Sequence, residues 1–141
     1  MKIFLSHAPK DGTLAHQLAE LLVQGGFTVW LSEDQINPGD NWAKVTGDAL
    51  EEAELMVLLL TPSAMKSESL RQNLEFALGS RKFEGRFFSV LVGPTWAVGK
   101  DAPWILFKLP HRIVESAKGF NDVVKDIQNL VQESPLSHAH A

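Results

Sequence analysis

The sequence contains no cysteine and no apolar run long enough to span a membrane. The absence of cysteine excludes disulfide bonds, thiolate catalysis and cysteine-ligated metal, and no metal site is expected. The apolar run at the N-terminus, residues 1–6, is too short for a signal peptide. The sequence therefore predicts a cytoplasmic protein without a membrane partner.

Basic residues are also in the minority. Thirteen Lys and Arg stand against 17 Asp and Glu, which gives a formal net charge of -4. Binding to a nucleic-acid backbone needs a basic face, so no nucleic-acid partner is expected. A single nucleotide is not excluded, because a few amides and one cation can hold it. At 141 residues, with 45% apolar and 21% charged residues, the chain is expected to form one soluble domain with a sizeable core.

Short apolar runs alternate with segments of helical periodicity along the chain. The apolar runs predict strands at residues 3–5, 27–31, 55–60 and 87–92, with a short edge strand at 112–114. The periodic segments predict helices at 14–22, ended by Gly25-Gly26, and at 42–52, 70–78 and 120–131.

This alternation predicts a parallel sheet covered by helices on both faces. The strand candidates are continuously apolar, as is typical of strands buried on both sides. In open sheets of this kind, ligands bind beyond the carboxyl ends of the strands. The loops after Leu5, Leu31 and Leu60 are therefore the expected functional edge.

Three segments, residues 3–8, 29–42 and 58–78, together resemble a TIR (Toll/interleukin-1 receptor) domain of bacterial type. The resemblance implies an α/β, flavodoxin-like three-layer sandwich with a five-stranded parallel sheet. We expect this domain to cover residues 1–132 and residues 133–141 to form a disordered tail. The family also implies self-association through loops and, in many members, cleavage of NAD at the nicotinamide-ribose bond.

The resemblance also places the residues of the active site. Active members carry a glutamate in the helix after the third strand, within a pattern like Ser-x-Trp-Cys-x-x-Glu-Leu. In this chain Ser67 takes the serine position, Ser69 the tryptophan position and Asn73 the glutamate position. An amide carries no negative charge, and Ser69 has no aromatic face on which a ring can stack.

The missing charge matters because glycosidic cleavage passes through an oxocarbenium-like state that an ionised carboxylate stabilises. One such group in a preorganised site is often worth roughly 3 kcal/mol or more. Glu75 is no substitute, because two residues along a helix is about 200° of rotation away from Asn73. Glu68 lies before the periodic part of the helix and is no better placed.

Several site candidates have a second interpretation. Asn73 could contact a ribose hydroxyl, be an engineered replacement of a glutamate, or be an ordinary polar residue on the helix surface. Ser67 is expected to cap its helix, with a substrate contact as the alternative. His7, just past the first strand, could hydrogen-bond a nucleotide or be incidental. Asp11 is expected to cap the first helix, with a place beside Lys10 at the border of an anion-facing loop as the alternative.

The loop after the second strand is the candidate interface. Pro38 and Gly39 predict a turn, and in a TIR-like domain this loop is also a contact surface between subunits. The predicted interface residues are Pro38, Gly39, Asp40 and Trp42. Elsewhere, Trp30 is expected in the core and Arg86 in a solvated turn.

Two functions remain open. The first is an interaction module for signalling or defence, which self-associates with other TIR domains as a homo-oligomer and has a degenerate nucleotide pocket. The second is an NAD+ glycohydrolase with an altered site. No cofactor is expected to be required, and NAD is expected as a possible substrate or ligand.

Overall fold

The computed structural model describes residues 1–31, 42–61, 68–79, 83, 85–93 and 108–133. Within them, five strands form one sheet in the order β2-β1-β3-β4-β5, and every neighbouring pair is parallel. The strands are β1 (Lys2–Ser6), β2 (Thr28–Leu31), β3 (Leu55–Leu60), β4 (Phe87–Val92) and β5 (His111–Val114).

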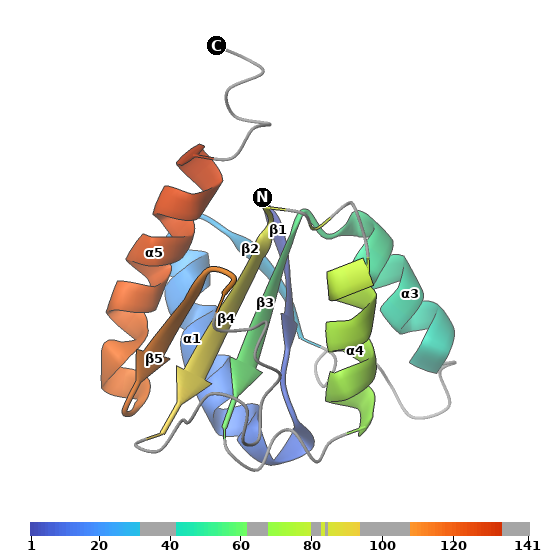
Figure 1. Ribbon diagram of the computed structural model, residues 1–141, viewed down its shortest axis with the longest axis horizontal. Helices are drawn as coiled ribbons and strands as arrows, with labels where there is room; N and C mark the ends of the chain where they lie inside the picture. The colour runs from blue at the N-terminus through green and yellow to red at the C-terminus, as the bar shows by residue number, and fades with distance from the viewer. Residues whose placement is uncertain (32–41, 62–67, 80–82, 84, 94–107, 134–141) are drawn as a thin grey trace.

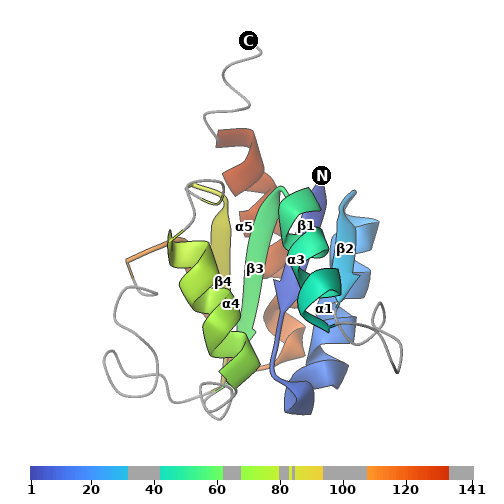
Figure 2. The same ribbon diagram turned by 90° about the vertical axis from the view of Figure 1, so that its right-hand side faces the viewer.

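Helices cover both faces of this sheet. They are α1 (Gly12–Gln24), α3 (Trp42–Glu52), α4 (Glu68–Gly79) and α5 (Phe120–Glu133), with 3-10 turns at Pro9–Asp11 and Ala117–Gly119. Figures 1 and 2 show α1 and α5 on one face and α3 and α4 on the other. The expected three-layer α/β architecture with a five-stranded parallel sheet is confirmed.

The core consists of two apolar layers separated by the sheet. Strands β3 and β4 are buried along their whole length, as their apolar runs predicted. Successive side chains alternate between the faces. Leu5, Val57 and Val90 pack with α1 and α5, whereas Phe4, Met56 and Leu58 pack on the face of α3 and α4.

The first helix ends where the glycines predicted. The backbone N–H of Gly25 donates to the Leu21 carbonyl, and Gly26 adopts a φ of 101°, which favours glycine. The side chain of Gln128 on α5 then donates to the Gly25 carbonyl over 3.1 Å. This bond ties the last helix to the turn that starts β2.

Two side chains differ from the sequence expectation. Arg86 is buried rather than solvated, with 5% of its surface exposed. Its backbone bonds Met56 and Phe83, and its Nη1 lies 3.6 Å from Met1 Sδ, so the side chain lies near the amino end of β1. Trp30 stacks on Phe4 with ring centroids 4.7 Å apart, but it is only half-buried because β2 is an edge strand.

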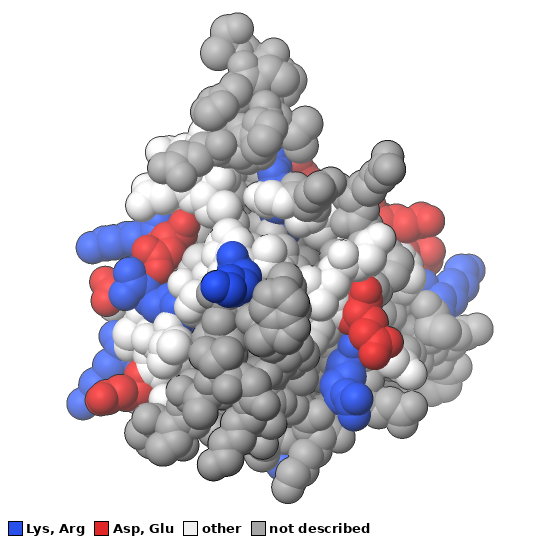
Figure 3. All heavy atoms as spheres, in the orientation of Figure 1, with Lys and Arg blue, Asp and Glu red and all other residues white. Residues whose placement is uncertain are grey.

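Other expectations concern parts of the chain outside the described residues. These include the loop at 32–41, the segment at 94–107 and the tail at 134–141. The boundary at residue 132 stays a prediction, and α5 itself continues to Glu133. Of the helices described, none has the length and apolar character needed to cross a membrane. Figure 3 shows acidic and basic side chains interspersed on the described surface of that view.

Candidate functional site

The carboxyl ends of β1 and β3 lie side by side, and a hydrogen bond joins the segments that follow them. The hydroxyl Oγ1 of Thr61 donates to Oδ2 of Asp11 over 3.0 Å. Thr61 is the first residue after β3, and Asp11 ends the 3-10 turn after β1. With 8% of its surface exposed, Asp11 is a buried carboxylate at the predicted ligand edge.

The sequence expectation that Asp11 caps α1 with its side chain is wrong. Asp11 does occupy the N-cap position, but its carboxylate accepts no hydrogen bond from the first turn of the helix. Its backbone N–H donates to the Ala8 carbonyl over 2.9 Å. The competing donor, Thr61, is 50 residues away in sequence, so local sequence carries no signal of this bond.

His7 lies at the same edge, as predicted, and is buried with 7% of its surface exposed. Its Nδ1 is 2.8 Å from the carbonyl oxygen of Ala8, and since a carbonyl only accepts, Nδ1 donates. His16, on α1, makes the same kind of bond to the Gly12 carbonyl over 2.7 Å. A contact between His7 and a nucleotide stays a prediction.

The structure leaves most of the other predicted site residues untested. Ser67, Pro38, Gly39 and Asp40 lie outside the described residues. Ser69 and Asn73 belong to α4 and Trp42 begins α3, but their side chains are likewise outside the description.

The residues that follow position 73 are described. Leu74 is buried in the apolar layer and Glu75 is exposed. The expectation that Glu75 does not replace a catalytic glutamate stays a prediction.

Two buried hydroxyl groups were missed by the sequence reasoning. In the part of the chain that the structure describes, Ser89 Oγ on β4 and Thr46 Oγ1 on α3 are buried and have no hydrogen-bond partner. Ser89 stands alone as a polar residue in an apolar strand, and only that interruption of the run marks it. Thr46 lies one turn into α3, on the buried side of the helix, with Ala49 and Leu50.

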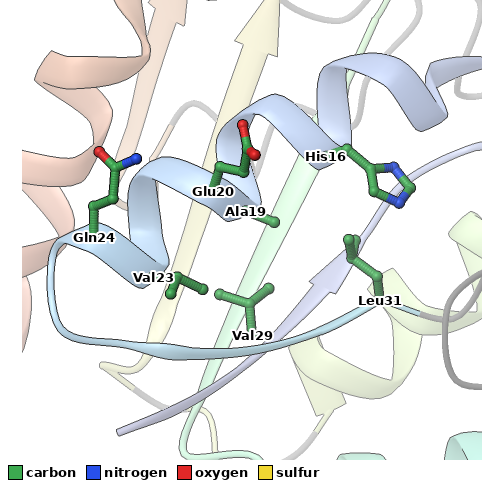
Figure 4. A pocket seen from close by; sticks show the side chains of 7 residues that line it. All are labelled: His16, Ala19, Glu20, Val23, Gln24, Val29 and Leu31. Carbon is green, nitrogen blue, oxygen red and sulfur yellow. The ribbon is translucent and has the colours of Figure 1, made fainter.

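A hollow of about 420 Å³ lies elsewhere, between α1 and β2 (Figure 4). It contains none of the predicted site residues; its lining is His16, Ala19, Glu20, Val23, Gln24, Val29 and Leu31. Among the described residues, no group of three or more His, Cys, Asp or Glu is placed to hold a metal ion.

A five-stranded parallel sheet with helices on both faces, and polar groups gathered at its carboxyl edge, defines a doubly wound α/β domain. The family model for the TIR domain matches residues 3–123. The chain therefore belongs to the TIR domain family, as its three motifs indicated.

Two known proteins resemble this chain, one in sequence and one in fold. The chain is 28% identical over 134 residues to the 2' cyclic ADP-D-ribose synthase BtTIR of Bacteroides thetaiotaomicron, covering 90% of this chain and 45% of that protein. The fold is similar to that of a metazoan TIR-STING receptor from C. gigas, solved in complex with 2',3'-cGAMP. The TM-score is 0.63 and the identity 17%, over 89% of this chain and 38% of the receptor. The chain thus spans less than half the length of either relative.

Proposed function

We propose that this chain is a TIR signalling or defence module that acts by self-association and carries a degenerate nucleotide pocket. Membership of the TIR family supports the module, and residue 73 carries the argument for a degenerate pocket. An amide stands there in place of the carboxylate that glycosidic cleavage uses. The serine at position 69 removes the stacking ring as well, so two positions of the pattern depart together.

The described carboxylate at the same edge does not restore that chemistry. Asp11 is buried and accepts a hydrogen bond from Thr61. One oxygen of this carboxylate is therefore already held by a protein hydroxyl. NAD is then a ligand of the pocket at most, and other TIR domains, including further copies of this chain, are the proposed partners. The cytoplasm is the proposed compartment.

A second function, NAD+ cleavage by an altered site, is favoured by one observation. The relative that matches over 90% of this chain is named as a cyclic ADP-ribose synthase. In this alternative, Asn73 positions water or a ribose hydroxyl, and a different acid supplies the charge. Asp11 is the described candidate for that acid.

Free nicotinamide, measured after incubation with NAD at high protein concentration, separates the two functions. The degenerate-pocket proposal expects no release above a buffer control. Release that disappears in Asp11→Asn, while the folded state is retained, would establish the alternative. Thr61→Ser is the matched control, because it keeps the hydroxyl donor to Asp11.

The reverse experiment restores the family pattern. The double variant Asn73→Glu with Ser69→Trp is expected to gain nicotinamide release, because it returns both the charge and the stacking face. Asn73→Gln with Ser69→Trp is the matched control, with an amide of the same length as glutamate. Equal activity in both double variants would show that charge at position 73 is not the deciding property.

A further inference from the structure

Strand β2 is an edge of the sheet, and half of its backbone groups point away from the protein. Its neighbour on one side is β1, and no described strand lies on the other. The N–H of Thr28 donates to the Met1 carbonyl over 3.0 Å, which directs the backbone of Thr28 toward β1. Because successive residues of a strand alternate in this direction, the N–H and C=O groups of Val29 and Leu31 point outward. An edge of this kind is a template for a further strand.

Both faces beside this edge are hollowed. The hollow of about 420 Å³ lies on the α1 side and is lined there by Val29 and Leu31. A second hollow of about 210 Å³ is lined by Thr28, Val29 and Trp30, together with residues of β1 and α3. Side chains of an added strand would alternate between these two spaces, as they do in recognition by strand addition.

We propose that two copies of this chain join edge to edge through β2, antiparallel, about a two-fold axis at Trp30. In this register Val29 of each copy lies opposite Leu31 of the other, and each such pair exchanges two backbone hydrogen bonds. All the outward groups of both residues are then satisfied. This inference rests on the proposed function, self-association, and names the surface that carries it.

The backbone rules out two alternative registers. An axis at Val29 would place Leu31 opposite Phe27, whose N–H already donates to the Leu22 carbonyl. An axis between two residues would pair side chains that point to opposite faces, which an antiparallel ladder does not allow. The axis at Trp30 avoids both conflicts and places two half-buried tryptophans side by side on the α3 face.

The side chains of the edge suit a second copy. Such an interface is isologous, so each apolar group must meet an apolar group of the same patch. Val29 and Leu31 meet each other, and Val23 on α1, 56% exposed, adds apolar surface beside them. In Figure 4, Val23 and Val29 point toward one another, whereas the Glu20 carboxylate points away from the strand. In the sequence, Leu31 is followed directly by residues 32–41, the segment that contains the predicted interface loop.

Proline substitution tests the backbone of the edge. Val29→Pro removes an outward donor without removing a hydrogen bond from the fold. The matched control is Ile113→Pro on β5, the opposite edge. There the Val114 carbonyl accepts from Gly93, so the Ile113 backbone points outward by the same alternation. Sedimentation over a concentration series is expected to show self-association weakened roughly tenfold or more by Val29→Pro and unchanged by Ile113→Pro.

A side-chain variant tests the same interface if the proline variant does not fold. Val23→Glu places a charge beside the hollow, and Leu78→Glu places one on α4 at another exposed apolar residue. Val23→Glu is expected to weaken association as strongly as Val29→Pro, and Leu78→Glu is expected to leave it unchanged.

The absence of cysteine permits a direct test of the axis. Trp30→Cys would place two thiols opposite each other, with Cα atoms about 4.5 Å apart as in a non-hydrogen-bonded pair. Mild oxidation is expected to give a disulfide-linked dimer, and Ile113→Cys is expected to give none.

The outcomes separate this inference from the function on which it rests. A wild-type chain that stays monomeric at every concentration contradicts self-association, and with it the proposed function. A chain that associates, but does so equally well with Val23→Glu and with Val29→Pro, contradicts the β2 interface alone. Equal weakening by the β2 and β5 variants, or crosslinking at residue 113 only, also overturns it.

Discussion

The Thr61 hydroxyl donates to the buried carboxylate of Asp11 across 3.0 Å, and this bond joins the exits of two neighbouring strands. One partner follows β1 and the other follows β3. Since α4 and residue 73 come after Thr61, the bond fixes the point at which the chain leaves the sheet toward the pattern of the family's active site.

Loss of this donor is expected to destabilise the fold. Thr61→Val leaves the Asp11 carboxylate buried without the hydroxyl, and we expect a loss of about 1–3 kcal/mol in the free energy of unfolding. Thr61→Ser retains the donor and is expected to lose much less. Denaturant unfolding of the three proteins measures the difference. A loss for Thr61→Ser with none for Thr61→Val would show that the methyl group, rather than the hydrogen bond, stabilises this edge.

Substitution by alanine is expected to change stability in opposite directions at two glycines. A Cβ at Gly119 would lie 2.6 Å from Val114 Cγ1 and 2.8 Å from Val114 Cβ, so Gly119→Ala is expected to destabilise by roughly 1–3 kcal/mol. A Cβ at Gly47, within α3, meets no atom within 4 Å. Gly47→Ala is therefore expected to stabilise by about 0.5–1 kcal/mol, because alanine is the better helix former. Thermal unfolding checks both signs.

The buried hydroxyl of Ser89 predicts a neutral or stabilising substitution. Its Oγ is buried without a partner on a strand that is apolar throughout its other positions. Ser89→Ala removes an unsatisfied polar group and is expected to raise the free energy of unfolding by up to about 1 kcal/mol. A clear loss of stability in denaturant unfolding would show that the hydroxyl has a role that its surroundings do not reveal.

The ion pair between β5 and α5 is expected to contribute little. Arg112 donates to both carboxylate oxygens of Asp126, the longer contact being 3.2 Å, and this bond raises the pKa of Arg112. While Asp126 is ionised, a raised pKa on a cation stabilises the fold below the ordinary arginine range, and the contribution is lost as the pH rises through the raised pKa. Because the two side chains are 40% and 28% exposed, Asp126→Asn is expected to cost only about 0.5–1 kcal/mol.

The salt dependence of this stability loss tests whether the ion pair causes it. The destabilisation caused by Asp126→Asn should shrink when unfolding is repeated at high ionic strength, since salt screens exposed charges. A loss independent of salt would indicate that packing, rather than charge, is what the substitution removes.

The elements of the fold were accessible from the sequence because their signals are local. The apolar runs at 55–60 and 87–92 mark strands buried on both faces, and the observed bounds coincide with them. Gly25 and Gly26 mark the end of α1 because a left-handed residue there strongly favours glycine. Such patterns depend on neighbours a few residues apart, so a single chain displays them.

The predictions that were wrong concern contacts between residues far apart in the sequence. Asp11 has the sequence context of a helix cap, yet its partner, Thr61, follows a distant strand. Arg86 has the context of a solvated turn but is buried beside Met1. The β2 edge, with its two hollows, is visible only when the order of the strands is known. The sequence by itself determined the family and the order of the elements, and it predicts an uncharged residue at the glutamate position, because each is a property of residue type and spacing. Only the tertiary structure decided which polar groups meet and which strand stays open, because those depend on packing between residues far apart in the chain.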